Sequence, residues 1–141
     1  MIKIETILKQ DKLDKSITEQ VILYKGESYT FFDSGLTRYC FVNKDKTKVI
    51  KLLIEQSAYR HDFNEEEFKI YKNASKEKKK ELAETKLSNG FIEQEFCNPI
   101  KFDDRKLTIK QLLFAKSCRN EVGWTKDGRL VCFDLDEYKK Y

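Results

Sequence analysis

Short β-rich runs joined by tight turns recur along this chain of 141 residues, and they constrain its fold more than any other feature. The sharpest example lies at 84–96, where Asn89-Gly90 separates two runs that contain β-branched and aromatic residues. Asn-Gly accepts the positive φ values of a type I′ turn, so this segment predicts a β-hairpin. Three further segments predict strand pairs in the same way: 21–32 around Lys25-Gly26, 38–54 around 43–46, and 121–133 around 126–128.

Helical patterns lie before and after these strand pairs. Apolar residues recur at three- and four-residue spacing from about 59 to 74, which predicts an amphipathic helix. The charged stretch 75–84 continues it as a short helix or a turn. The first fifteen residues carry a looser helical pattern, and they suit an opening helix packed on the domain.

Another helix is expected in the last third of the chain. Asp103-Asp104 can accept hydrogen bonds from free N–H groups at a helix start, which predicts a helix over about 105–118. Its apolar side comprises Leu107, Ile109, Leu112, Leu113 and Phe114. With the strand pairs, this order predicts an α+β fold: an antiparallel sheet with a packed helix, then a short C-terminal helix and a β-hairpin.

Composition narrows the function classes. The length suits one domain, 1–141, with a sizeable core. Lys and Arg total 28 against 24 Asp and Glu, and this excess of +4 is dispersed along the chain. Nucleic-acid binding normally needs a concentrated basic surface, and this dispersed charge falls short of one. The function stays an alternative, in which the dispersed Lys and Arg side chains would act together with Trp124.

Membrane and metal–thiol functions find little support in the sequence. No apolar run approaches the roughly 20 residues that cross a bilayer, and the first residues are charged, so we expect a cytoplasmic protein without a membrane partner. The four cysteines lack the paired spacing of a zinc site, which predicts buried, reduced thiols. His61 is the only histidine, and it lies in a charged stretch, so chemistry that needs several His ligands or a Ser–His pair has almost no residues to use.

The order of these elements resembles the protein-kinase fold, especially the small kinase-like proteins of phages and mobile elements. In that family a glycine turn precedes the second strand, and Gly35 in the segment 33–39 is similar to it. Lys51 falls where the family places the strand lysine that holds nucleotide phosphates. Glu67, in the helix after it, is similar to the glutamate that pairs with this lysine.

The resemblance extends to the C-terminal part of the chain. It places Glu95 at the hinge beside the nucleotide, and Asp134 at the metal-binding aspartate, with Asp136 or Glu121 as a further ligand. It implies a nucleotide site with Mg-ATP as the cofactor, if there is one. It also implies a division into an N-lobe-like part, 1–97, and a shortened C-lobe remnant, 98–141.

Departures from the family pattern bear on activity. The glycine loop retains only Gly35, and the family's spacing puts Lys116 at the catalytic aspartate and Glu121 at the catalytic-loop asparagine. A lysine with an ordinary pKa of about 10.4 is a poor proton acceptor at neutral pH. Asp136 replaces the glycine of the metal-binding motif, and the chain ends before an activation segment. These losses favour a protein that is not an enzyme.

Three functions therefore stay open. The first is a non-catalytic, pseudokinase-like binding protein with a protein partner, such as a phage-type inhibitor or modulator acting in the host cytoplasm. Its expected contact surface is the acidic and aromatic C-terminus: Asp136, Glu137, Tyr138 and Tyr141. The second is a minimal Mg-ATP-binding phosphotransferase or nucleotide hydrolase that uses Lys51, Glu67 and Asp134. The third is the nucleic-acid-binding protein described above.

Overall fold

The computed structural model describes residues 3–10, 16–34, 38–53 and 62–138, and it has an α+β fold. Its β-strands are β1 (Lys3–Gln10), β2 (Ser16–Tyr24), β3 (Glu27–Ser34), β4 (Arg38–Asn43), β5 (Lys48–Leu53), β6 (Thr85–Ser88), β7 (Phe91–Glu95), β8 (Asn98–Pro99), β9 (Val122–Trp124) and β10 (Leu130–Cys132). Its helices are α1 (Phe63–Asn73), α2 (Lys76–Lys79), α3 (Ile109–Ser117) and the 3₁₀ turns η1 (Ile100–Phe102) and η2 (Leu135–Glu137).

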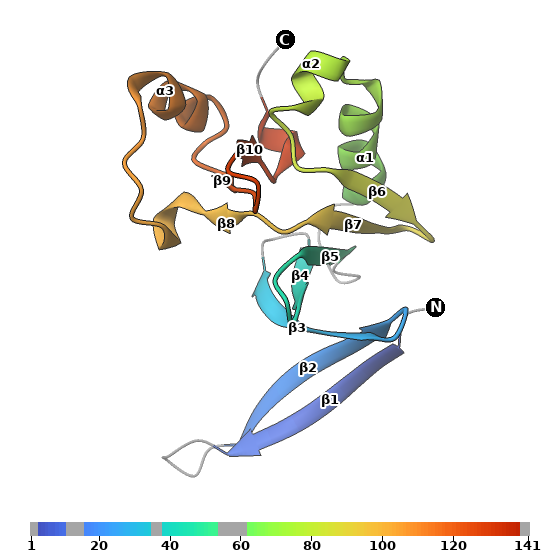
Figure 1. The fold of residues 1–141 in the computed structure, drawn as a ribbon. Coiled ribbons are helices and arrows are strands. Elements are labelled where there is room, and N and C mark those ends of the chain that lie inside the picture. Colours follow the sequence, from blue (N-terminus) through green and yellow to red (C-terminus); the bar gives the residue numbers. More distant parts are fainter. Residues whose placement is uncertain (1–2, 11–15, 35–37, 54–61, 139–141) are drawn as a thin grey trace.

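Two antiparallel sheets organise the described residues. The larger has seven strands in the order β1-β2-β3-β4-β5-β7-β6, and the smaller has three in the order β10-β9-β8. The β1–β2 hairpin extends away from the rest of the molecule, while α1 lies beside β6 and β7 (Figure 1). The small sheet and α3 lie on the other side of the β7–β8 connection (Figure 1).

The turn predictions are confirmed. Asn89 and Gly90 have φ values of 50° and 85°, and Lys25 and Gly26 have values of 49° and 77°, so both pairs are left-handed at each central residue, as a type I′ turn requires. Gly128, with φ of 84°, closes the last hairpin. These turns join β6 to β7, β2 to β3 and β9 to β10 as the sequence predicts.

The predicted opening helix is wrong. Residues 3–10 form strand β1, which pairs along its whole length with β2, from Lys3 opposite Leu23 to Gln10 opposite Ser16. The segment also carries a period of two, with Ile4, Thr6 and Leu8 at alternate positions. Pairing with a β-rich neighbour therefore decides between two patterns that the sequence alone supports almost equally.

The two main helices begin at different caps. The helix predicted from 59 is observed as α1, and the Asp62 carboxylate accepts from the N–H of Glu65 at its start; 59–61 lie outside the described residues. The helix predicted from 105 begins only at Ile109, because Thr108 and Gln111 form a capping box there. Among the described residues, no helix is long and apolar enough to span a membrane.

The cap predicted at Asp103-Asp104 is wrong for an identifiable reason. The carboxylate of Asp103 accepts from the backbone N–H and the guanidinium of Arg105, at 2.8 to 3.0 Å. The aspartate side chain is thus engaged with the chain two residues later and does not cap the start of α3. All four cysteines are free thiols, as predicted, and three of them are buried.

The two larger apolar clusters of the described residues lie in different parts of the molecule. The curled sheet encloses the first, formed by Ile22, Tyr24, Tyr29, Phe41, Ile50 and Phe91. The second joins α3, β9, β10 and η2 through Leu82, Ala115, Cys118, Val122, Cys132, Leu135 and Tyr138. Ile70 and Tyr71 of α1 pack against this second cluster, so α1 links the large sheet to the C-terminal part.

Gly123 is where the small sheet leaves no room for a side chain. A Cβ atom built there would lie 2.6 Å from the Asn98 carbonyl oxygen and 3.1 Å from the Cys97 carbonyl carbon. We expect Gly123→Ala to lower the free energy of unfolding by about 1–3 kcal/mol, because backbone must move to relieve the overlap. Urea unfolding checks this against Lys126→Ala in the exposed turn of the same hairpin. Equal midpoints for both variants would contradict it.

Candidate functional site

Three neighbouring strands present buried polar side chains toward α1. Directly opposite residues of an antiparallel pair lie on the same face of a sheet. Cys40 on β4 lies opposite Lys51 on β5, and Val49 lies opposite Gln94 on β7. Arg38 stands two residues before Cys40 and shares this face. The exposed fractions of these polar side chains are small: 8% for Arg38, 4% for Lys51 and 3% for Gln94. This face of the sheet therefore carries polar side chains that are shielded from solvent.

Glu67 supplies the carboxylate on which these side chains converge. It lies in the middle of α1 and is fully buried, and Asn64 is the only other buried residue of that helix. Its Oε1 accepts from Lys51 Nζ at 2.6 Å and from Gln94 Nε2 at 3.0 Å. Its Oε2 accepts from Arg38 Nη1. The helix therefore meets the sheet through a carboxylate held by two cations.

The same two cations bind the segment that follows β10. Lys51 Nζ donates to the main-chain carbonyl of Phe133 at 2.6 Å. Arg38 Nη2 lies 3.3 Å from Asp134 Oδ1 and 3.8 Å from Asp136 Oδ2. Two cations and three carboxylates thus join β4, β5, α1 and the C-terminal segment. We call these five side chains the charge network: Arg38, Lys51, Glu67, Asp134 and Asp136.

Two amide side chains brace this arrangement. Asn64 Nδ2 donates to the carbonyls of Lys51 and Gly90 at 3.1 and 3.0 Å, which ties the first turn of α1 to β5 and to the β6–β7 turn. Gln94 Nε2 also donates to Thr85 Oγ1 at 3.0 Å. The carboxylate of Glu67 and its partners are therefore positioned by a hydrogen-bonded frame as well as by charge.

Burial acts to raise the pKa of each of the three carboxyl groups, the nearby cations act to lower it, and at Asp134 and Asp136 a neighbouring carboxylate adds to the rise. At Glu67, burial would raise the pKa, but Lys51 and Arg38 together outweigh it and hold the pKa below its ordinary value. At Asp134, burial prevails over Lys51 and Arg38 and raises the pKa. At Asp136, burial and then the charge of Glu67 raise the pKa to about 6.

The raised pKa of Asp136 predicts a specific pH dependence. In the unfolded chain this group ionises near its ordinary pKa of about 3.9, so between that pH and about 6 the folded state binds more protons. Ionisation therefore costs stability as the pH rises through this window. We expect Asp136→Asn to raise the urea midpoint at pH 7.5 and to raise it clearly less at pH 4.5. A variant less stable than the wild type at pH 7.5 would contradict this.

The three carboxylates lie close enough together to be compared with a metal site. Glu67, Asp134 and Asp136 each offer one oxygen within 4.8 Å of the others, and carboxylate oxygens are ligands that Mg²⁺ prefers. However, the guanidinium of Arg38 already bonds to the first two and lies against the third. The residues therefore do not fit a magnesium ion while Arg38 is in place, because an internal cation already balances their charge.

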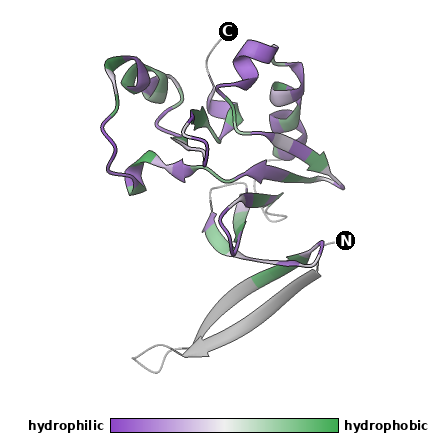
Figure 2. Ribbon diagram, viewed as in Figure 1, coloured by the Kyte–Doolittle hydropathy of each residue, from purple (hydrophilic) through white to green (hydrophobic). Residues whose placement is uncertain are grey.

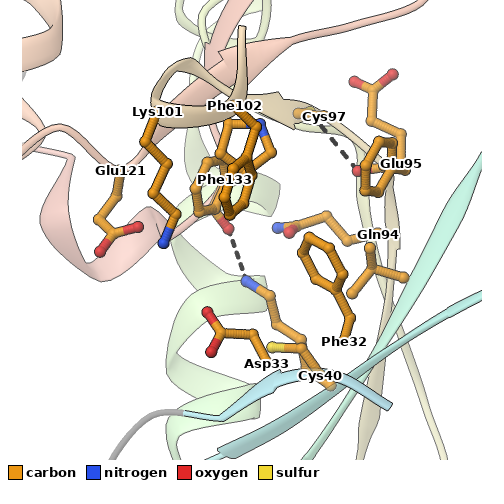
Figure 3. A pocket seen from close by; sticks show the side chains of 14 residues that line it. Phe32, Asp33, Cys40, Gln94, Glu95, Cys97, Lys101, Phe102, Glu121 and Phe133 are labelled. Atoms are coloured by element: carbon orange, nitrogen blue, oxygen red, sulfur yellow. Dashed lines mark hydrogen bonds between the residues drawn. The ribbon is translucent and has the colours of Figure 1, made fainter. Parts of the chain in front are cut away.

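A pocket opens beside Lys51, between the large sheet and the chain after β7. Phe32 and Phe133 extend toward it from different elements, and Lys101 and Glu121 lie together at one end (Figure 3). Its volume is about 110 Å³, smaller than the roughly 300–1,000 Å³ of typical sites for drug-sized ligands. A flat ring fits between the aromatic walls more readily than a complete nucleotide.

Four of the predicted site residues meet in the charge network: Lys51, Glu67, Asp134 and Asp136. Glu121 lines the pocket, where burial and then the charge of Asp134 raise its pKa. Glu95 also lines the pocket, but its carboxylate accepts from the N–H of Glu84 at 2.9 Å and pairs with Arg129 at 3.5 Å. It is thus not directed at Lys51.

Other sequence-based expectations meet different outcomes. Gly35 lies outside the described residues, and Lys116 is exposed on α3. Of the expected exposed C-terminal surface, Tyr141 lies outside the described residues, Asp136 and Glu137 are half-buried, and the exposure expected of Tyr138 is wrong. Tyr138 is 9% exposed and donates to Glu81 at 2.7 Å, and Glu137 pairs with Arg119 at 3.2 Å. Apolar packing by η2 holds this segment against the domain.

Sequence reasoning missed Arg38, Asn64 and Gln94 as members of the site. The available indication was strand alternation: Arg38 and Gln94 occupy positions whose neighbours at i±2 are apolar or small, where a polar side chain needs a buried partner. Asn64 lies three residues before Glu67 and therefore on the same face of the helix. The helical spacing that indicated Glu67 as a site residue also indicates Asn64.

Comparisons with protein-family models, with curated proteins and with solved structures gave no match to this chain. The functional case therefore stands on the geometry of the charge network and on the pocket beside it.

Proposed function

We propose that this chain is a non-catalytic, protein-kinase-like binding protein, which acts by engaging another protein as an inhibitor or modulator. Its expected lysine–glutamate pair is formed, between Lys51 and Glu67 at 2.6 Å. A pair of this kind supports the kinase-like part of the proposal. The proposal assigns the pair a structural role, in which it joins the helix to the sheet.

The position of Arg38 carries the non-catalytic part of the proposal. Phosphoryl transfer on this scaffold would need Mg²⁺ at Asp134 to neutralise the developing charge on the phosphates. Arg38 donates to Asp134 and to Glu67 and lies near Asp136. The guanidinium of Arg38 stays protonated, so its positive charge cannot be lost to make room for a metal ion. A metal ion must therefore displace Arg38 from its buried ion pairs in order to bind. That cost opposes a catalytic cycle.

Absence of a suitable base points in the same direction. Lys116 stands where the resemblance requires an acidic proton acceptor, and it is exposed on α3. Glu121 stands at the expected metal-binding asparagine, and its carboxyl has a raised pKa because it is partly buried near Asp134. Neither residue supplies what the transfer reaction needs at its position.

Nucleotide binding is the second candidate, and the pocket beside Lys51 favours it. Aromatic and aliphatic walls from Phe32, Val49 and Phe133 suit a planar base, with Gln94 and Lys51 as polar neighbours. If this function holds, Mg-ATP stabilises the fold, by about 2.7 kcal/mol at 100 times its Kd.

Thermal unfolding with millimolar Mg-ATP separates the two candidates. We expect an unchanged melting temperature for the wild type, together with no phosphate release or transfer. A rise in the melting temperature that Lys51→Met or Asp134→Asn abolishes would overturn the non-catalytic proposal in favour of the nucleotide-dependent one. Because both variants also disturb the charge network, their own melting temperatures without ligand serve as the reference.

A further inference from the structure

Helix α3 carries a second apolar stripe that faces away from the domain. Its inner side packs through Ala115, which is 1% exposed. On its outer side Ile109, Leu112 and Leu113 are 79%, 47% and 64% exposed. The helix lies at the edge of the molecule, and its ribbon includes apolar segments, drawn green (Figure 2).

The spacing of this outer stripe is that of a helix that contacts another helix. Ile109, Leu112 and Leu113 occupy positions i, i+3 and i+4, and the exposed Lys116 follows at i+7. Helical segments that dock on a partner use anchors at these positions. The apolar side predicted from the sequence therefore includes residues that face solvent, while the helix packs on the domain through Ala115.

The charged side chains on α3 itself have one sign, since Ile109–Ser117 carries Lys110 and Lys116 and no acidic residue. From 105 to 120 the chain contains five Lys and Arg and not one Asp or Glu: Arg105, Lys106, Lys110, Lys116 and Arg119. Arg105 and Arg119 pair with acidic residues elsewhere, at 2.8 and 3.2 Å. The exposed Lys110 and Lys116 lie on the helix itself, beside and within the apolar stripe.

We propose that this outer face of α3 is the docking surface for an acidic amphipathic helix of a partner protein. The proposal rests on the proposed binding function and names its contact surface. Ile109, Leu112 and Leu113 pack against apolar residues of the partner helix, and its Asp and Glu side chains approach Lys110 and Lys116. Apolar anchors supply affinity, and the complementary charges set the choice and orientation of the partner.

A second copy of this chain and a lipid surface fit the face less well. Two copies meeting at this face bring Lys110 and Lys116 toward the same residues of the other molecule, and like charges repel at such contacts. Membrane association grows with the apolar area inserted, and this stripe has three apolar side chains on a helix of nine residues. An acidic amphipathic helix can cover the apolar side chains of α3 and also pair its carboxylates with Lys110 and Lys116.

Selection from a displayed library of random 18-residue peptides tests the proposal on the whole chain. We expect the selected peptides to be amphipathic and acidic, and to bind Ile109→Asp/Leu113→Asp at least tenfold more weakly than the wild type. Lys110→Glu/Lys116→Glu is expected to lose these peptides and to select basic ones. Lys72→Glu/Lys76→Glu, exposed on α1 and α2, is the charge control and is expected to retain the acidic peptides.

Four outcomes would overturn the proposal: failure to enrich acidic amphipathic peptides, peptides that bind the Ile109→Asp/Leu113→Asp variant as tightly as the wild type, co-sedimentation of the wild type with phosphatidylserine vesicles that this variant loses, or a wild-type dimer that this variant converts to monomer. The substituted side chains are exposed, so circular dichroism is expected to match the wild type. Mg-ATP stabilisation does not involve α3, so the docking surface and the non-catalytic assignment can fail separately.

Discussion

Replacement of Glu67 by Gln is expected to lower the free energy of unfolding by about 3–5 kcal/mol, since it leaves two buried cations without their shared carboxylate. Glu67 is fully buried and accepts from Lys51, Arg38 and Gln94. An amide of the same shape cannot accept from all of them without presenting its own N–H groups to a cation. Urea unfolding followed by circular dichroism measures the loss.

Glu65→Gln on the same helix is the matched control. Its carboxylate is exposed and pairs with Lys69 at 3.5 Å, one turn later. Exposed pairs of this kind are worth about 0.5 kcal/mol or less, so the control is expected to unfold close to the wild type. If Glu67→Gln unfolded at the same urea concentration as Glu65→Gln, the buried network would not be the element that holds α1 to the sheet.

Arg38→Met is expected to destabilise the protein by about 3 kcal/mol at pH 7, because three carboxylates then share only Lys51. Arg38 now lowers the pKa values of Glu67, Asp134 and Asp136. Without it these values rise, the folded variant binds more protons than the unfolded chain, and stability recovers as the pH falls from 7 toward 5. Urea midpoints at both pH values measure this.

Arg119→Met provides a control of the same residue type for that experiment. Arg119 is exposed and pairs with Glu137 at 3.2 Å, so its loss is expected to cost under about 1 kcal/mol and to show no recovery at pH 5 beyond that of the wild type. An Arg38→Met variant whose stability fell further at pH 5 would contradict the role assigned to the guanidinium.

The parts of the fold that follow from the sequence are those decided by neighbouring residues. Asn89-Gly90 and Lys25-Gly26 specify their turns locally, because the required positive φ values are available within the two residues. The pairing of Lys51 with Glu67 was expected only through the resemblance to kinases, and the geometry of that contact agrees with it.

The parts that do not follow depend on distant contacts. Strand β1 forms because β2 pairs with it, although its apolar spacing also suits a helix. The sequence predicts the apolar side of α3 but does not say which residues of the helix meet the domain, and Ile109, Leu112 and Leu113 are exposed. Arg38 joins the site because β4 lies beside β5 and opposite α1, an arrangement that no local pattern encodes.

Titration of Mg²⁺ into the wild type and into Arg38→Met, followed by calorimetry, tests the central claim most directly. The claim is that Arg38 supplies the cation for Glu67, Asp134 and Asp136, so that the domain works without a metal. It predicts no binding heat and no gain in stability for the wild type at millimolar Mg²⁺, and stabilisation of Arg38→Met by the same metal. Binding of Mg²⁺ to the wild type that Asp134→Asn abolishes would contradict it.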